Sequence, residues 1–161
     1  MQTKGSSYLY DRSSKKTEYY DKRSKIPREE YFKLIKESTT LYIGNLNINT
    51  TEEKLYNFFS NFVPIKNIVV GIHKKKFTPC GFCFVELYSR ADTESLRTSL
   101  NGVFVDNKKI YMDYDPGFKE GRQYGRGHSG GQVKDEFTSR NSYSGKRYND
   151  GGERNKRRKY D

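Results

Sequence analysis

Apolar and polar positions in the central part of the chain follow the periods of a mixed α and β domain. Four short runs rich in β-branched and aromatic residues are typical of strands. They cover residues 39–45, 65–72, 80–88 and 108–115. Two segments between these runs, 50–60 and 89–102, repeat apolar residues at helical spacing. The order βαββαβ within 38–115 predicts an α+β domain with a four-stranded antiparallel sheet and two helices on one face.

Both predicted helices carry start or stop signals. The first opens with threonines followed by acids, as at a capped helix start. The second ends at Gly102, the residue type that most often follows a helix. Its Ala91, Leu96 and Leu100 are expected to form the buried stripe that faces the sheet.

Composition divides the chain into four parts. Residues 1–37 form a polar, basic extension with a short helix predicted over 27–38, and 38–115 hold nearly all aliphatic residues. Residues 116–136 are rich in Gly and Arg, and 137–161 lack the apolar content to build a core and are predicted to be disordered. We expect the N-terminal extension and 116–136 to be mobile until a ligand orders them.

Overall composition limits the classes of protein. The chain has 31 Lys+Arg against 20 Asp+Glu, a net charge of +11, which favours a nucleic-acid partner. Only 32% of it is hydrophobic, and no apolar run approaches the roughly 20 residues of a membrane span. The N-terminus lacks the apolar stretch of a signal peptide, so a soluble intracellular protein is expected.

The sequence gives no support for a metal site or for catalysis. Cys80 and Cys83 form a lone CxxC without a second Cys or His pair, and strand positions three apart point to opposite faces. We interpret them as ordinary strand cysteines and expect no cofactor or metal. No nucleophile–base pair or phosphate loop occurs, so an enzyme is not expected.

Three aromatic residues are predicted on the sheet face that the helices leave uncovered. By alternation, Tyr42, Phe82 and Phe84 point away from the helices. They either cover a patch at a flanking helix or dimer contact, or stack on bases. Together with Gly81 and Val85 they resemble the paired motifs of the RNA recognition motif, whose aromatics at these positions stack on RNA bases.

The stretch YMDYD, residues 111–115, places Tyr111, Asp113 and Asp115 on the same face by alternation. Carboxylates repel phosphates but accept hydrogen bonds, and the guanine edge offers adjacent donors. Methylation at N7 makes guanine cationic and favours stacking on tyrosine. The pattern therefore indicates a site for 7-methylguanine, with a solvent-facing aspartate at the strand end as the alternative.

The glycine-rich segment that follows supplies two arginines. Arg122 and Arg126 lie within residues 118–136 and are predicted to fork onto a triphosphate. A disordered RGG-like tail is the alternative, although the motif does not repeat here.

Residues 38–136 together resemble the small subunits of nuclear cap-binding complexes. Four segments carry the resemblance: TLYIGNL, TTEEKLYNFFS, CGFCFVELYSRAD and DPGFKEGRQYGRGHSGGQVKDE. It implies a nuclear protein that binds the 7-methylguanosine cap of RNA polymerase II transcripts in a heterodimer with a large helical subunit. It also implies roles in pre-mRNA splicing, processing and RNA export, with shuttling to the cytoplasm. The alternatives are a single-stranded RNA-binding protein of splicing-factor type and a protein-interaction module.

The resemblance also implies which residues bind the cap. Tyr42 and Tyr19, with Tyr20 as the alternative, would sandwich the methylated base, while Phe82 and Phe84 support it from the sheet. Further contacts are implied for Tyr111, Met112, Asp113, Tyr114, Asp115, Arg122, Gln123, Tyr124, Gly125, Arg126, Gln132 and Val133. Tyr111 stands where the family often has arginine. The basic cluster NKRRK at 155–159 suits nuclear localisation or a solvated charge run.

Overall fold

The computed structural model describes residues 19–137, so the predicted disordered tail from residue 138 and its basic cluster lie outside the described residues. Helices and strands occur in the predicted order, preceded by the predicted N-terminal helix. The elements are a 3-10 turn Lys22–Ser24, α1 Arg28–Glu37, β1 Thr40–Gly44, α2 Glu52–Ser60, β2 Ile65–Ile72, β3 Pro79–Leu87, α3 Arg90–Leu100, β4 Phe104–Val105, β5 Lys108–Lys109 and β6 Tyr111–Asp115.

The main sheet has the strand order β2-β3-β1-β6, and every neighbouring pair is antiparallel. The register sets Tyr42 of β1 directly between Phe84 of β3 and Asp113 of β6. Directly paired residues point to the same face, so an aromatic pair and a carboxylate lie side by side. The predicted α+β fold class is confirmed.

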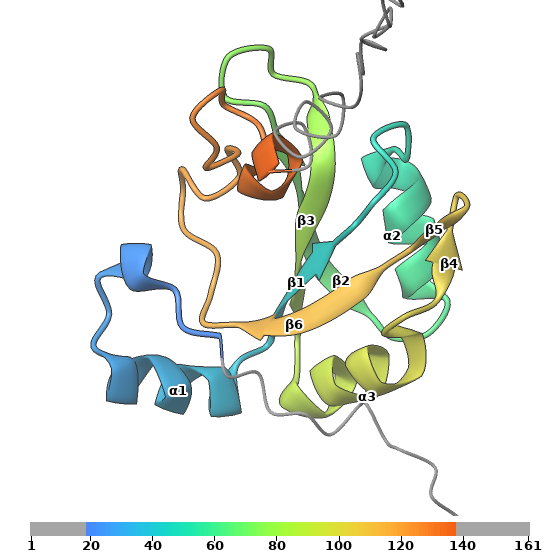
Figure 1. The fold of residues 1–161 in the computed structure, drawn as a ribbon. Coiled ribbons are helices and arrows are strands. Elements are labelled where there is room, and N and C mark those ends of the chain that lie inside the picture. The colour runs from blue at the N-terminus through green and yellow to red at the C-terminus, as the bar shows by residue number, and fades with distance from the viewer. Residues whose placement is uncertain (1–18, 138–161) are drawn as a thin grey trace, which may run out of the picture.

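Helices α2 and α3 cover one face of this sheet (Figure 1). Leu41, Ile43, Cys83 and Val85 point to this side and are fully buried with the helices' apolar residues. Burial of each such aliphatic side chain contributes about 1.5–3 kcal/mol. Helix α2 begins at the predicted threonine cap, and α3 begins at Ser89; the Thr51 and Ser89 side chains accept from backbone N–H groups of the first turn. Among residues 19–137, no helix is long and apolar enough to cross a membrane.

The buried stripe of α3 differs from the predicted one. Ala91 is exposed, whereas Thr93 and Arg97 are buried beside Leu96 and Leu100. Residues 93, 96, 97 and 100 follow the i, i+3, i+4, i+7 spacing of one helical face, and Ala91 lies outside it. Arg97 is accommodated because its Nε donates to the carbonyl of Met112 at 3.1 Å.

The last predicted strand, 108–115, is divided in the structure. Residues 108–109 form β5, which pairs with β4 in a separate hairpin, and Ile110 turns into the core before β6 begins. Asp106 and Asn107 have φ values of 49° and 65°, as a two-residue hairpin turn requires. The Asp-Asn pair was the local signal for this turn.

The sheet face opposite α2 and α3 is partly covered, which corrects the prediction that it is open. Segments 19–39 and 116–137 lie across it (Figure 1). As a result, Phe82 and Phe84 expose only 5% and 3% of their surface, although both point to this face as predicted. The mobility of the two extensions in the absence of ligand stays a prediction.

Candidate nucleic-acid interface

Three aromatic rings form the floor of the covered face. The Tyr42 and Phe82 rings are stacked at 5.7 Å, and Phe84 meets both nearly edge-on at 5.7 and 5.9 Å. The Phe82 ring lies so close to Gly71 of β2 that a Cβ there would be 2.4 Å from it. Only glycine at this position lets the ring lie flat over the neighbouring strand.

The C-terminal extension is attached to the end of β2 by main-chain hydrogen bonds. Ile72 N–H donates to the Gln123 carbonyl at 2.8 Å, and Gly125 N–H donates to the Ile72 carbonyl at 2.9 Å. Further along, Gln132 Nε2 donates to the Cys80 carbonyl at 2.6 Å, and the Tyr42 hydroxyl donates to Gln132 Oε1 at 3.5 Å. Residues 123–132 are thereby held beside the three rings.

A buried ion pair lies beside the three aromatic rings. Both terminal nitrogens of the Arg122 guanidinium, Nη1 and Nη2, donate to the Asp115 carboxylate, at 2.5 and 2.7 Å. The same guanidinium lies 4.8 Å from the centre of the Phe84 ring. Burial alone would lower the pKa of Arg122, but the hydrogen bonds and charge of Asp115 outweigh it and raise that pKa. Arg122 therefore stays charged and is held by Asp115.

A second ion pair joins the two extensions. Arg126 Nη1 donates to Asp21 Oδ2 at 2.8 Å, and Asp21 is almost fully buried. Arg23 Nη1 also donates to the Arg126 carbonyl at 3.2 Å. Tyr31 of α1 is buried close to Asp21 and Asp115; burial is the main cause that raises its pKa to about 12, and the two carboxylates add to it.

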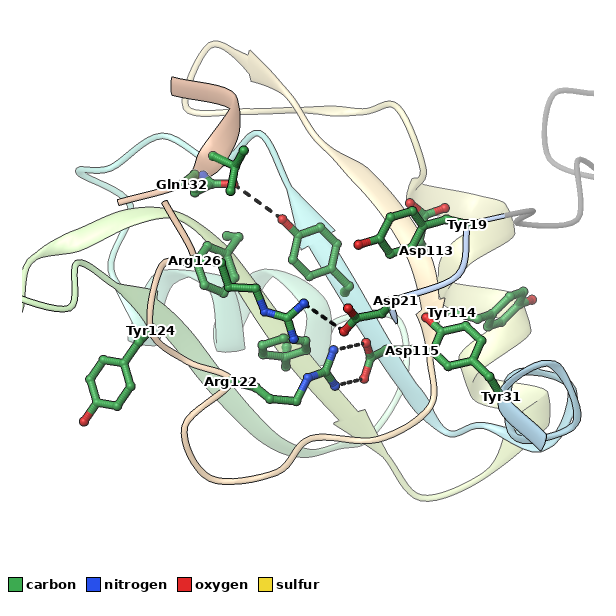
Figure 2. Close-up of a pocket in the computed structure, with 14 residues that line it drawn as sticks. Tyr19, Asp21, Tyr31, Asp113, Tyr114, Asp115, Arg122, Tyr124, Arg126 and Gln132 are labelled. Carbon is green, nitrogen blue, oxygen red and sulfur yellow. Dashed lines mark hydrogen bonds and ion pairs between the residues drawn. The ribbon is translucent and has the colours of Figure 1, made fainter. Parts of the chain in front are cut away.

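The rings, the ion pairs and the extensions surround a pocket of about 330 Å³ (Figure 2). Its volume falls in the range of small-ligand sites, about 300–1,000 Å³. The pocket is lined by Tyr19, Asp21, Tyr31, Tyr42, Phe82, Phe84, Asp113, Tyr114, Asp115, Arg122, Tyr124, Arg126, Gln132 and Val133. Aromatic surface, carboxylates and arginines therefore meet in one cavity, which suits a flat, charged ligand with hydrogen-bond donors.

Of the residues implied by the resemblance, four do not line this pocket. Met112 points into the core and is 1% exposed, because it alternates with Asp113 along β6. Tyr111 is exposed at the start of the strand. The Gln123 side chain donates to Glu120 at 2.6 Å instead, and Gly125 is packed against Gly131. The remaining implied residues line the cavity together with two that were not predicted, Asp21 and Tyr31.

Tyr114 contacts the pocket and also the helix layer. Its ring contacts the guanidinium groups of both Arg90 and Arg97, whose Cζ atoms are 4.0 and 4.8 Å from the ring centre. Arg90 also donates to the carbonyls of Ile35 and Ser38 at 2.8 and 2.9 Å, which fixes the end of α1. The Tyr114 ring therefore belongs to the scaffold of the site.

The two candidate N-terminal tyrosines occupy different environments. Tyr19 lines the pocket and is 64% exposed. Tyr20 packs edge-on against Tyr31 at 5.1 Å, and its hydroxyl donates to the Ile26 carbonyl at 2.5 Å. Tyr20 therefore holds the N-terminal extension together, and Tyr19 is the tyrosine available to a ligand.

The cysteines lie on β3, as predicted. Cys83 is in the core, and burial raises its pKa above the ordinary thiol range. Cys80 is partly buried at the start of the strand, and burial raises its pKa to about 11. Both thiols are therefore protonated near neutral pH. Within 19–137, no group of three or more His, Cys, Asp or Glu side chains could hold a metal ion.

The sequence and the fold were compared with known proteins. The family model of the RNA recognition motif matches residues 41–111. "Nuclear cap-binding protein subunit 2" of Homo sapiens is 54% identical over 121 residues, which cover 75% of this chain and 78% of that protein. The protein of the same name from Bombyx mori is 50% identical over 129 residues, 80% of this chain and 82% of that protein. A solved structure of the Sex-lethal RNA recognition domains 1 and 2 from Drosophila melanogaster aligns with a TM-score of 0.45 and 28% identity, over 48% of this chain and 49% of that chain.

More than three quarters of each of these two curated relatives is matched at 50% identity or above. The chain therefore belongs to the nuclear cap-binding protein subunit 2 family and contains an RNA recognition motif.

Proposed function

We propose that this protein binds the 7-methylguanosine cap at the 5′ end of nuclear RNA polymerase II transcripts. It acts as the small, non-catalytic subunit of a heterodimeric nuclear complex that supports pre-mRNA splicing, processing and export. The observation that carries the proposal is one pocket in which two tyrosines, Tyr19 and Tyr42, meet an exposed carboxylate on β6. The names of its relatives support the same ligand.

The tyrosines supply the stacking surface for the methylated base. Tyr42 is fixed from behind by Phe82 and at its hydroxyl by Gln132, so little side-chain freedom is lost when a base stacks on it. Tyr19 is more exposed and lines the same pocket from the N-terminal extension. A cationic ring on a tyrosine gains about 0.5–2 kcal/mol over a neutral ring of the same shape.

Asp113 is the better candidate for reading the guanine edge. It is exposed and directly opposite Tyr42 in the sheet. Asp115 accepts from both Arg122 nitrogens and from Gly117 N–H, and only 5% of the residue is exposed. A carboxylate offers about four acceptor positions, so Asp115 has little capacity left for guanine donors. Its proposed role is to hold Arg122.

Arg126 is the proposed phosphate contact. A third of its side chain is exposed, and Asp21 occupies one of its terminal nitrogens, Nη1. A guanidinium carries five N–H donors, so a phosphate can bind without displacing Asp21. Arg122 is more buried and bound through both terminal nitrogens, which makes it a less accessible phosphate ligand.

Ligand preference tests the proposed function directly. The experiment uses the full chain co-expressed with its large helical subunit. Unlabelled 7-methyl-GTP should displace labelled 7-methyl-GTP from this complex at lower concentration than GTP does. We expect a difference of about 2- to 30-fold from the cation–π term alone. Fluorescence anisotropy with both competitors measures it. Equal competition by both nucleotides would exclude specific cap binding and favour an ordinary single-stranded RNA-binding protein.

The proposed binding surface for the large subunit lies on the other side of the molecule from the pocket. Tyr56 and Phe62, at and just after α2, expose 46% and 52% of their surface, and Phe104 of β4 exposes 70%. The hairpin β4–β5 is joined to this helix, because Lys54 pairs with Asp106 of its turn. Exposed large apolar residues on adjoining elements are typical of a protein interface.

This surface can be tested without touching the pocket. Replacing Tyr56 and Phe104 together by serine should abolish co-purification with the large subunit. Each lost aromatic anchor at an interface typically costs about 2 kcal/mol or more. Thermal unfolding of the isolated variant should stay close to wild type because both rings are exposed. Undiminished co-purification would place the interface elsewhere.

A further inference from the structure

The β2–β3 loop, residues 73–78, has features that cap binding does not use. It carries three exposed lysines in a row, Lys74–Lys76, followed by Phe77 with 66% of its surface exposed. Phe77 also has a φ of 57°, in the left-handed region that bulky residues avoid. A large ring that is both exposed and conformationally unfavourable contributes little to the core, and such outliers gather at binding sites.

The loop has a fixed conformation in spite of its exposure. His73 Nδ1 accepts from the backbone N–H groups of Lys75 and Lys76 at 3.1 and 3.2 Å. The backbone of His73 also bonds to Thr78 and Phe77, each at 2.8 Å. These bonds fix the backbone while the lysine side chains extend into solvent.

The loop is continuous with the proposed cap site. The Phe77 ring meets the Tyr124 ring edge-on at 6.4 Å, and Tyr124 lines the cap pocket. Figure 2 shows the Tyr124 ring pointing away from the two ion pairs. Lys74 N–H donates to the Gly130 carbonyl at 2.8 Å, so the loop lies against the same extension that carries Arg126 (Figure 1).

We propose that this loop and Tyr124 bind the single-stranded RNA that continues from the capped 5′ end. Phe77 stacks on a base, and the lysines contact the phosphates beside it. A basic groove with stacking aromatics is the combination by which proteins hold single strands without reading their sequence. This inference rests on the proposed cap-binding function, because the cap places the RNA next to Tyr124.

The test compares a short and a long ligand on the full complex with the large subunit. The short ligand is the cap dinucleotide m7GpppA, and the long one is a capped RNA of about twelve nucleotides, within the length that such sites cover. The wild-type complex should bind the capped RNA several-fold more tightly than it binds m7GpppA. Phe77→Asn removes the ring but keeps a residue that tolerates the left-handed conformation. It should weaken the long ligand by about 5-fold or more and leave m7GpppA unchanged.

The lysines are tested by salt dependence. Lys75→Gln with Lys76→Gln should flatten the slope of log affinity against log salt for the long RNA. The expected change is up to about 1.4, at roughly 0.7 for each single-strand phosphate contact. Lys33→Gln with Lys36→Gln on α1 removes the same charge from other exposed positions and should leave the slope unchanged.

The outcomes separate this inference from the cap function. If m7GpppA is not preferred over GpppA, the proposed function fails. If that preference holds but the long RNA gains nothing in wild type, only the loop contact is overturned. Equal weakening of both ligands by Phe77→Asn would show that the loop merely supports the extension, and would overturn the contact. If Phe77→Asn loses a bound protein while its RNA binding is unchanged, the RNA contact is overturned and the loop is a protein-binding surface instead.

Discussion

Replacing Tyr42 by alanine is expected to lower the affinity for 7-methyl-GTP by about 5- to 150-fold, the equivalent of 1–3 kcal/mol for one base–aromatic stack. The ring is central to the site: it stacks on Phe82, touches Phe84 and pairs with Asp113 across the sheet. Burial is the main cause that raises the pKa of Tyr42 to about 12. The phenol is therefore neutral near pH 7, and Tyr42 itself should not change charge as pH rises from 6 to about 9.

Tyr42→Phe is the matched control, since it keeps the ring and removes only the long hydrogen bond to Gln132. It should lie within a few-fold of wild type, because a net hydrogen bond contributes about 0.5–1.5 kcal/mol and this one is at the distance limit. Titration of labelled 7-methyl-GTP against the complex with the large subunit measures all three proteins. An alanine variant that binds as well as the phenylalanine variant would exclude Tyr42 as a stacking partner.

The fold was predictable because its information is local. Strands with alternating residues and helices with capped ends are each specified within about ten residues. The hairpin β4–β5 was missed although its signal was local too, because Asp106–Asn107 lay within a polar run without apolar alternation around it. The α3 stripe was misassigned because its prediction named apolar residues only. It included the exposed Ala91 and omitted Thr93 and Arg97, which are buried, Arg97 through its aliphatic stem.

The covering of the sheet was not predictable, because the bonds responsible join distant parts of the chain. Asp21 and Arg126 are 105 positions apart, and residues 116–137 have no apolar pattern that would indicate packing. Main-chain bonds such as Ile72 to Gln123 leave no trace in side-chain composition. The sequence nevertheless predicted most of the residues that line the pocket, since motif and resemblance identify positions and do not depend on their contacts.

Asp113 and Asp115 show the limit of reading a strand by alternation. Both lie on the pocket face, as the period of two requires, and in sequence they are equivalent candidates for the guanine edge. In the structure one is exposed beside Tyr42, and the other is buried against Arg122. The difference arises from the extension that returns over the strand end. Neutralising the two carboxylates is therefore expected to affect different properties, stability for Asp115 and choice of base for Asp113.

Asp115→Asn should destabilise the site without changing its choice of base. It leaves the Arg122 guanidinium partly buried beside Phe84 without its carboxylate, and breaking a buried pair in this way costs about 3–5 kcal/mol. Because a fifth of the Arg122 side chain is exposed, we expect the lower end of that range. Urea denaturation should show the loss, and trypsin should cleave faster at Arg122. Affinity for GTP and 7-methyl-GTP should fall by the same factor.

Asp113→Asn is the comparison that assigns the choice of base. It changes an exposed residue, so stability should be nearly unchanged, while guanine donors meet a poorer acceptor and the cationic ring loses a countercharge. Affinity for 7-methyl-GTP should fall about tenfold or more, and that for GTP by less. Adding Arg122→Gln to Asp115→Asn should recover part of the lost stability, since both members of the pair are then neutral. If Asp115→Asn instead weakens 7-methyl-GTP selectively at unchanged stability, Asp115 reads the base and its pair with Arg122 opens when the cap binds.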